Sequence, residues 1–258
     1  MIHARALTKI FKDKKRGKIL AVNNVSFTCK PGEIYGLLGV NGAGKTTTLR
    51  LLATMLRPSS GSAEIAGFDI VNQPEQVRAN IGFLSTATAL YGRLTAREFI
   101  EYFARLNGMS EEKLGGRVDS LIQTLGIVEF ANGRCDKLST GMKQRVSIAR
   151  SVVHDPPVMI FDEPTLGLDV LSSRDIVKFI RDCRAQAKTV IFSSHVMTEV
   201  EKLCDRIGII HDGKLLREGT LADLRAASNL NDLEEIFVQT VLTGTSPGKS
   251  TSPQTQPR

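Results

Sequence analysis

The sequence predicts an α/β fold with a mainly parallel central sheet. Residues 39–46 read Gly-Val-Asn-Gly-Ala-Gly-Lys-Thr and fit the pattern G-x-x-x-x-G-K-S/T. The apolar run 34–38 before this loop is typical of a buried strand, and apolar side chains in 49–56 recur at helical spacing. The fully apolar run 158–161 predicts a second strand at the centre of a parallel sheet.

The residue types of this loop suit phosphate binding. Glycines let backbone N–H groups turn toward an anion, and the N-terminus of the following helix adds a partial positive charge. Lys45 would reach the terminal phosphates of ATP, and the Thr46 hydroxyl would hold Mg²⁺. A glycine turn that happens to precede a lysine is the alternative, and the flanking strand and helix argue against it. The expected nucleotide-binding residues are Gly39, Val40, Asn41, Gly42, Ala43, Gly44, Lys45, Thr46 and Thr47.

Length and composition allow one large α/β domain, or a core with an inserted subdomain. The chain has 258 residues, of which 41% are hydrophobic. No apolar run approaches the roughly 20 residues that span a bilayer, and the N-terminus lacks an apolar signal segment, so we expect a soluble cytoplasmic chain.

The four cysteines have no C-x-x-C spacing, which favours reduced thiols over disulfides or zinc. The net charge of +7 fits nucleic acid, an anionic membrane surface or, most simply, a solvated surface.

The first third of the chain alternates strands with turns. Strands are expected at 2–7 and 21–27. The stretch 12–18 between them reads Lys-Asp-Lys-Lys-Arg-Gly-Lys and is expected to be a basic exposed loop at a hairpin tip, with contact to a partner or to lipid headgroups as the alternative. The helix after the phosphate loop is expected to stop before Pro58, and a short buried strand follows at 81–84.

A helical region then interrupts the strands. A capping box at 95–98 predicts the start of one helix, a second helix follows from Ser110, and a third starts near Thr140 and ends before Pro156. We therefore interpret residues 87–155 as a helical subdomain inserted into the core.

Strands resume after this region. A helix and strands at 189–193 and 206–210 follow the apolar run 158–161, and Asp212-Gly213 is a strong hairpin signal. Short helices are expected near the C-terminus. From Thr243 the composition changes to Ser, Thr, Pro, Gln and Gly, which predicts a disordered tail.

Two acidic residues, Asp162 and Glu163, end the apolar strand. A carboxylate at the tip of a strand beside a phosphate loop is placed to bind Mg²⁺, directly or through water, which assigns that role to Asp162. Glu163 would point elsewhere and polarise a water for in-line attack on the γ-phosphate. The alternative is an ordinary pair of acidic residues at a strand end.

Three further stretches resemble one family. Residues 138–145, Leu-Ser-Thr-Gly-Met-Lys-Gln-Arg, resemble the ABC signature. Residues 162–169, Asp-Glu-Pro-Thr-Leu-Gly-Leu-Asp, are similar to the ABC Walker B and D-loop, and 193–195, Ser-Ser-His, to the H-loop. Their order and spacing match the ABC nucleotide-binding domain from residue 1 to about residue 240.

The resemblance implies further site residues. Phe11 sits where an aromatic ring stacks on adenine, with a buried aromatic as the alternative. His195 would contact the γ-phosphate. Ser139 and Gly141 begin a helix that, in this family, faces the ATP bound to the opposite subunit. Two ATP molecules would then be held between two head-to-tail subunits, so a homodimer is expected that closes on ATP and reopens after hydrolysis.

The resemblance also implies a division of the chain. The ABC ATP-binding domain would span 1–243 and the tail 244–258. Within the domain we expect an ATPase core with an N-terminal antiparallel β subdomain, a helical subdomain with the signature, and C-terminal helices. The corresponding ranges are 1–86 with 156–220 for the core, 87–155 for the helical subdomain and 221–243 for the C-terminal helices.

Some residues depart from the family pattern. Thr140 replaces the first central glycine of the signature and Met142 replaces its glutamine, whereas Gly141 is kept. Thr86 stands at the position of the Q-loop glutamine, which in the family reaches magnesium. Threonine is too short for that reach, so Thr86 would act through water.

The stretch 90–98, the substituted Q-loop and the run 194–200 resemble ATPase subunits of ABC-2-type exporters, among them the bacterial sodium-efflux NatA type. This implies a separate transmembrane permease, a place at the cytoplasmic face of the cell membrane and no nucleic acid partner. A soluble ABC ATPase acting on nucleic acid is one alternative, but neither a long coiled coil nor a second phosphate loop is present. A nucleotide-dependent regulator with weak hydrolysis is the other, and Glu163 and His195 argue against it.

Overall fold

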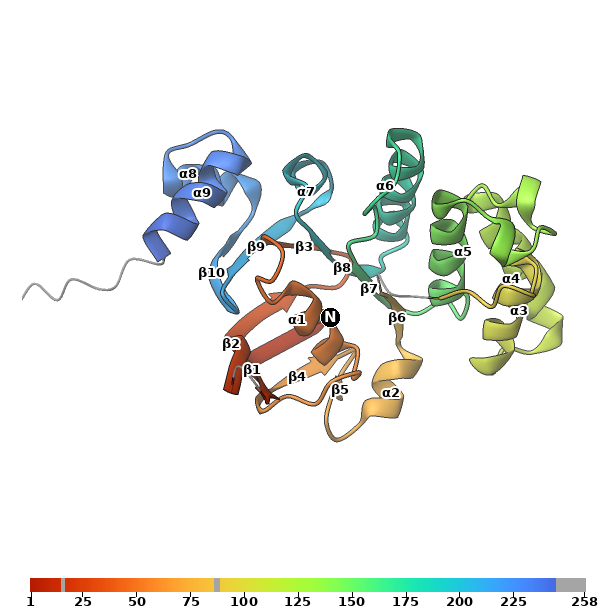
Figure 1. The fold of residues 1–258 in the computed structure, drawn as a ribbon, viewed down its shortest axis with the longest axis horizontal. Helices are drawn as coiled ribbons and strands as arrows, with labels where there is room; N and C mark the ends of the chain where they lie inside the picture. Colours follow the sequence, from red (N-terminus) through yellow and green to blue (C-terminus); the bar gives the residue numbers. More distant parts are fainter. Residues whose placement is uncertain (15–16, 86–88, 245–258) are drawn as a thin grey trace, which may run out of the picture.

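The computed structural model describes residues 1–14, 17–85 and 89–244. It has the predicted α/β fold, in which a larger, mainly parallel sheet lies beside a smaller antiparallel sheet (Figure 1). Helices α3, α4 and α5 gather at one end of the molecule, and α8 and α9 lie at the other. Within the described residues, no helix is both long enough and apolar enough to cross a bilayer.

The larger sheet has the strand order β10-β9-β3-β8-β7-β6. Its strands are parallel except for β10, which pairs antiparallel with β9 through the predicted Asp212-Gly213 hairpin. Every residue of β3, β7 and β8 is buried, as expected for strands at the centre of a parallel sheet. The bounds are β3 (Ile34–Leu38), β6 (Ile81–Leu84), β7 (Val158–Asp162), β8 (Thr189–Ser194), β9 (Arg206–His211) and β10 (Lys214–Gly219).

The smaller sheet has the order β2-β1-β4-β5 and is antiparallel. The prediction of a loop at 12–18 was wrong at both ends, because β1 continues through Asp13 and β2 already begins at Gly17. Cross-strand hydrogen bonds extend the hairpin where composition alone indicated a loop. The bounds are β1 (Ile2–Asp13), β2 (Gly17–Cys29), β4 (Ser60–Ile65) and β5 (Phe68–Asp69).

Helix α1 (Lys45–Leu52) packs between the two sheets. Its side chains Leu49 and Leu52 are fully buried in one apolar cluster with Val25 of β2 and Ile160 of β7. This packing holds the N-terminus of α1 at the carboxyl ends of the parallel strands, where ligands bind in open α/β sheets.

The predicted helical region contains α3, α4 and α5. Thr95 caps α3 as expected, since its side chain accepts from the Glu98 backbone N–H while the Glu98 carboxylate accepts from the Thr95 backbone N–H. We keep 87–155 as the proposed bounds of this subdomain; residues 87 and 88 lie outside the described residues. The helices and short 3₁₀ turns are α3 (Ala96–Leu106), α4 (Glu111–Thr124), η1 (Val128–Phe130), η2 (Cys135–Lys137) and α5 (Thr140–Val152).

The remaining helices cover the core and the C-terminal side. Helices α2 and α7 were not predicted, because both are short and show no long apolar periodicity. Helix α9 ends at Gly244, one residue beyond the predicted start of the tail, and residues 245–258 lie outside the described residues. The bounds are α2 (Pro74–Ala79), α6 (Val170–Ala185), α7 (Met197–Leu203), α8 (Leu221–Ser228) and α9 (Leu233–Gly244).

The cysteines are free thiols, as the sequence predicts. Burial raises the pKa of the Cys183 thiol to about 12 and also raises the pKa of Cys29. Such thiols stay protonated and unreactive near neutral pH.

Candidate functional site

The phosphate loop connects β3 to α1 and requires glycine for steric reasons. Gly44 has a φ of 107°, a left-handed conformation that suits glycine. A Cβ atom at Gly44 would lie 2.6 Å from the Ala21 carbonyl oxygen, and one at Gly39 would lie 2.5 Å from the Ile210 carbonyl oxygen. The glycines therefore let the loop pass close to β2 and β9.

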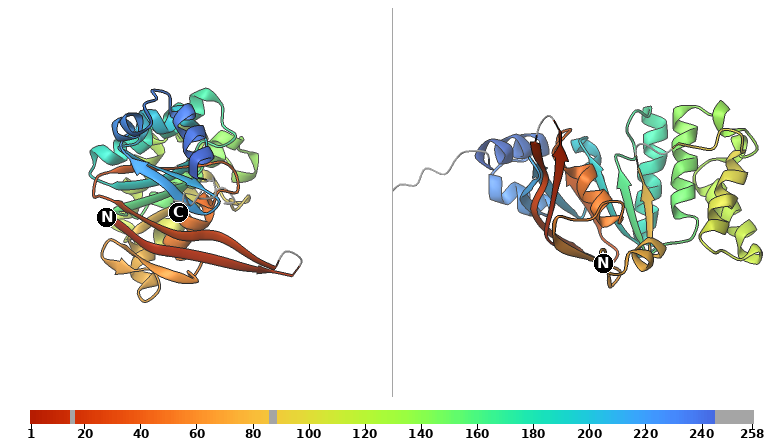
Figure 2. Two further views of the ribbon diagram at one scale, coloured as in Figure 1. Left: turned by 90° about the vertical axis from the view of Figure 1, so that its left-hand side faces the viewer. Right: turned by 60° about the horizontal axis from the view of Figure 1, so that its bottom comes forward.

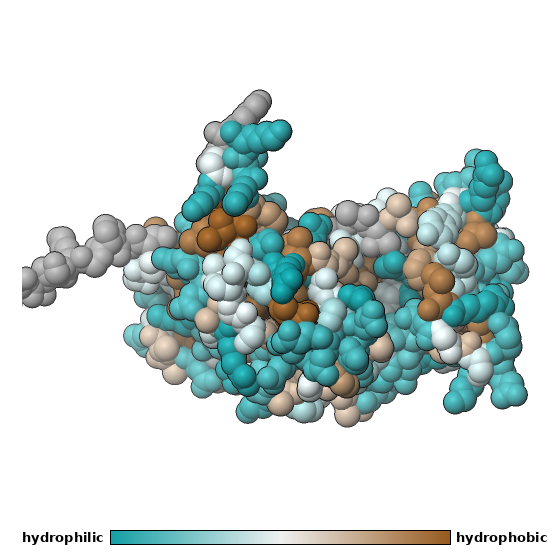
Figure 3. All heavy atoms as spheres, turned by 90° about the horizontal axis from the view of Figure 1, so that it is seen from below, coloured by the Kyte–Doolittle hydropathy of each residue, from teal (hydrophilic) through white to brown (hydrophobic). Residues whose placement is uncertain are grey.

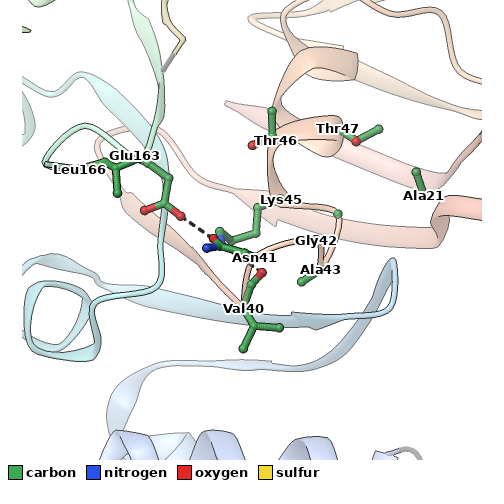
Figure 4. Close-up of a pocket in the computed structure, with 11 residues that line it drawn as sticks. Ala21, Val40, Asn41, Gly42, Ala43, Lys45, Thr46, Thr47, Glu163 and Leu166 are labelled. Carbon is green, nitrogen blue, oxygen red and sulfur yellow. Dashed lines mark hydrogen bonds and ion pairs between the residues drawn. The ribbon is translucent and has the colours of Figure 1, made fainter. Parts of the chain in front are cut away.

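A cavity of about 290 Å³ opens over this loop (Figure 4). Lys45 and Glu163 point toward each other across it, from the start of α1 and the end of β7. Gly39 does not line the cavity but contacts Lys45 through its carbonyl oxygen. Ala21 and Leu166 line the cavity and were not predicted, because a small or apolar side chain carries no chemical signal in a sequence. The lining residues are Ala21, Val40, Asn41, Gly42, Ala43, Gly44, Lys45, Thr46, Thr47, Glu163 and Leu166.

The Lys45 ammonium group is 5% exposed and fully engaged. Nζ donates to the carbonyl oxygens of Gly39 at 2.6 Å and Val40 at 3.3 Å. It also forms an ion pair with Glu163 Oε1 at 3.0 Å. A buried ammonium needs such partners, because desolvation without them is costly.

Glu163 lies between the side chains of Lys45 and His195. Its Oε2 atom is 2.9 Å from His195 Nδ1, on the side away from Lys45. Its backbone has a φ of 48°, a left-handed conformation uncommon for residues other than glycine. The Ser193 hydroxyl accepts from the Glu163 backbone N–H at 2.9 Å and helps to hold this conformation. Strained backbone of this kind persists where its surroundings fix it, and it clusters at functional sites.

Thr46 and Asp162, the two residues predicted to hold magnesium, lie in contact. Thr46 Oγ1 donates to Asp162 Oδ1 at 2.9 Å, and Ser193 Oγ donates to the same oxygen at 2.8 Å. Asp162 Oδ2 is buried and has no hydrogen-bond partner among the described residues. A hydroxyl and a carboxylate with an unused oxygen are ligands that suit Mg²⁺, so these residues fit the ion.

Glu199 on α7 links two loops around the site. It accepts hydrogen bonds from the Thr165 hydroxyl at 2.8 Å and the Ser194 hydroxyl at 3.4 Å. The Ser194 hydroxyl in turn accepts from the Val196 backbone N–H at 3.0 Å. These bonds fix the backbone on both sides of His195. The sequence marks Glu199 as an acidic residue after the histidine but does not reveal its partners.

Ser139 and Gly141 are not part of this cavity. Ser139 caps α5, where its hydroxyl accepts from the Met142 backbone N–H at 3.3 Å. A Cβ atom at Gly141 would lie 2.8 Å from Ser172 Oγ, so glycine permits close packing of α5 on α6. The site residues predicted from the signature thus lie apart from the phosphate loop of their own chain.

Phe11 also lies outside the cavity lining. It is 36% exposed on β1, so the alternative of a buried aromatic is wrong. Lys9 Nζ lies 5.3 Å from the centre of its ring, within the range of a cation–π contact. Thr86, the predicted substitute for the Q-loop glutamine, lies outside the described residues.

Comparison with known proteins identifies the family. A model of the family described as ABC transporter matches residues 22–166. The chain belongs to the ABC transporter family. It is 42% identical over 247 residues to the ABC transporter ATP-binding protein NatA of Bacillus subtilis (strain 168), an alignment that covers 95% of this chain and 100% of NatA. The ABC match spans the phosphate loop and the strand with Asp162 and Glu163.

Two further relatives extend the comparison. The chain is 38% identical to the Nod factor export ATP-binding protein I of Paraburkholderia xenovorans (strain LB400), over 87% of this chain and 74% of that protein. A solved dimeric ATP-binding cassette in a post-hydrolysis state, bound to ADP and Pi, superposes with a TM-score of 0.78 and 28% identity, covering 85% of this chain and 98% of the other. The chain is therefore an ABC transporter ATP-binding domain with the ABC ATPase fold, in a family whose members bind ATP and are generally ATP hydrolases.

Proposed function

We propose that this ABC ATP-binding domain binds and hydrolyses ATP to drive an exporter. It would act on a separate transmembrane permease at the cytoplasmic face of the membrane. The contact of Glu163 with both Lys45 and His195 is the observation that supports hydrolysis most directly. The carboxylate lies between the lysine of the phosphate loop and His195, which we propose contacts the γ-phosphate. Export is supported by the relationship to the Nod factor export protein, and sodium as cargo by the NatA resemblance alone.

Each residue has a proposed role in the reaction. Backbone N–H groups of the loop and the α1 N-terminus bind the phosphates, and Lys45 exchanges Glu163 for phosphate oxygens. Glu163, released from Lys45, accepts a proton from the attacking water. His195, held by the loop that Glu199 fixes, donates a hydrogen bond to the γ-phosphate. Thr46 and Asp162 would hold Mg²⁺, which supplies charge neutralisation for the phosphates when it is bound.

We propose that the active unit is a head-to-tail homodimer. Ser139 and Gly141 stand at the N-terminus of α5, outside the cavity of their own chain. A serine hydroxyl, glycine and a helix N-terminus all favour an anion, so these residues would complete the partner's ATP site. The similarity to the dimeric cassette with ADP and Pi supports this arrangement. Phe11 would stack on the adenine of the bound ATP.

The rate of ATP hydrolysis tests this function. Wild-type chain and Glu163→Gln would be compared at several protein concentrations with ATP and Mg²⁺. We expect a wild-type rate per subunit that rises with protein concentration, and a rate lower by roughly a hundredfold in the variant. Equal slow rates, together with tight ATP binding, would favour the nucleotide-dependent regulator. A rate independent of protein concentration would contradict the shared site.

A further inference from the structure

The β1–β2 hairpin projects away from the body of the protein. Its strands extend to Asp13 and from Gly17, and Figure 2 shows them standing clear of the rest of the fold. In Figure 3 the coloured part of the outer projection is mainly hydrophilic, and hydrophobic side chains gather at its base. None of the roles proposed above uses the outer end of this hairpin beyond Phe11.

The register of the hairpin places two kinds of side chain on one face. From residue 10 to residue 13 the pairing is unbroken: Ile10 lies opposite Leu20, and Lys12 lies opposite Lys18. Because side chains alternate along a strand, these two cross-strand pairs share a face. We call this set of four residues the hairpin face. Phe11, one residue along, points to the other side.

The apolar pair of the hairpin face is unusually exposed. Ile10 is 38% exposed and Leu20 is 45% exposed, although both lie in regular strand. Two large aliphatic side chains opposite each other form a small apolar patch on a projecting element, where the fold itself cannot cover them.

The cationic pair of the hairpin face brings two like charges together. Lys12 and Lys18 lie directly opposite each other, and like charges in this position destabilise a sheet. Lys14 follows at the turn. Among the described residues, no carboxylate forms an ion pair with any of these three lysines. An anionic surface would remove the repulsion that the hairpin carries on its own.

We propose that the hairpin face binds the surface of an anionic lipid bilayer. Ile10 and Leu20 enter the boundary between headgroups and acyl chains, and the longer Lys12 and Lys18 side chains reach the phosphates. With the hairpin face lying flat on the bilayer, the apolar pair meets the acyl boundary and the neighbouring cationic pair meets the anionic headgroups. The contact is electrostatic and reversible, because two aliphatic side chains alone give weak membrane affinity.

Vesicle cosedimentation of the full chain tests this proposal. Vesicles of phosphatidylcholine with about one-third phosphatidylglycerol would be compared with pure phosphatidylcholine at low salt. We expect binding to the anionic vesicles only, and loss of binding at high salt because the charges are screened. The variant Lys12→Gln/Lys18→Gln should bind roughly 25-fold less well, at roughly fivefold for each lysine. The variant Ile10→Thr/Leu20→Thr, which has β-branched side chains suited to strands at both positions, should also bind less.

A matched control distinguishes binding by the hairpin face from nonspecific attraction of the positively charged chain to the vesicles. Lys113→Gln/Lys178→Gln removes the same charge from exposed lysines elsewhere and should bind as the wild type does. Binding of a fluorescent ADP analogue shows that each variant is folded. If the wild-type chain did not bind the analogue, that result would contradict the proposed function rather than the proposed lipid contact. The proposal is overturned if wild type ignores anionic vesicles, or if the Lys12→Gln/Lys18→Gln variant binds them equally. Hairpin-dependent binding of an oligoglutamate peptide without vesicle binding would make the face a protein-docking surface and also overturn it.

Discussion

Lys45 Nζ and Glu163 Oε1 lie 3.0 Å apart, so the ammonium group of the phosphate-loop lysine is paired with the carboxylate proposed to activate water. Both side chains are largely buried, which strengthens this contact relative to an exposed ion pair. We propose that Lys45 exchanges this carboxylate for phosphate oxygens when nucleotide binds. The same carboxylate is thereby released for its proposed role in hydrolysis.

Glu163→Gln should bind ADP with Mg²⁺ about tenfold more tightly than the wild type, equivalent to ~1.4 kcal/mol. The neutral amide neither holds Lys45 as an ion pair nor repels the phosphates. Calorimetric titration with ADP measures this effect without interference from hydrolysis. Glu129→Gln, a change at an exposed glutamate, is the control. Unchanged or weaker ADP affinity in Glu163→Gln would refute the proposal that Glu163 and the phosphates compete for Lys45.

Lys45→Ala should abolish ATP binding, because it removes the buried cation that faces the phosphates. The change leaves Glu163 without its ion-pair partner, so circular dichroism is needed to show that the fold is retained. Titration with a fluorescent ATP analogue checks the prediction, with Lys113→Ala as the matched control. Retained affinity for ATP would contradict the assignment of this cavity as the ATP-binding site.

Ser139→Arg should leave nucleotide binding to the monomer intact and block dimer closure. The serine lies at the N-terminus of α5, away from its own phosphate loop, so a large side chain there would clash with the partner's site. Size-exclusion chromatography with ATP in a Glu163→Gln background measures closure. A normal ATP-dependent dimer with Ser139→Arg would show that this surface is not at the interface.

Glu199→Ala should lower the maximal rate of ATP hydrolysis roughly tenfold with little change in nucleotide affinity, because it releases the loops that position the site. The carboxylate accepts hydrogen bonds from Thr165 and Ser194, and Glu199 does not line the cavity over the phosphate loop. Steady-state kinetics separates the two parameters, and Glu199→Gln, which keeps an acceptor oxygen, should recover part of the rate. Equal losses in Glu199→Ala and Glu199→Gln would argue against this positioning role.

Acid should destabilise the fold partly through His154. Burial lowers the pKa of His154, whose Nε2 atom lies 3.0 Å from the Ile81 carbonyl oxygen. The folded-state pKa is therefore below the unfolded-state pKa of about 6.5. Stability from this residue is complete above that unfolded value and is lost as the pH falls through the lower folded value. Urea unfolding as a function of pH should show that His154→Gln loses less free energy of unfolding on acidification than the wild type. An unchanged pH profile would refute the contribution of His154.

Local patterns predicted most of the fold. The run 158–161 and the capping box at 95–98 predicted a buried strand and a helix start correctly, because burial and capping leave clear periodic or chemical signals. The hairpin was predicted too short, since its outer half is exposed on both sides and lacks the alternation of a half-buried strand. Helix α7 was missed because a seven-residue helix leaves too short a pattern to recognise.

By itself, the sequence determined the phosphate loop, the acidic strand end and the family, because these depend on residue types at fixed spacing along the chain. Tertiary structure alone decided which side chains meet. The contacts of Glu163 with Lys45 and His195 join residues from three separate segments. Likewise, only the cross-strand register places Ile10, Leu20, Lys12 and Lys18 on one face. Such contacts depend on how strands and helices pack in space, which a spacing pattern within one segment does not encode.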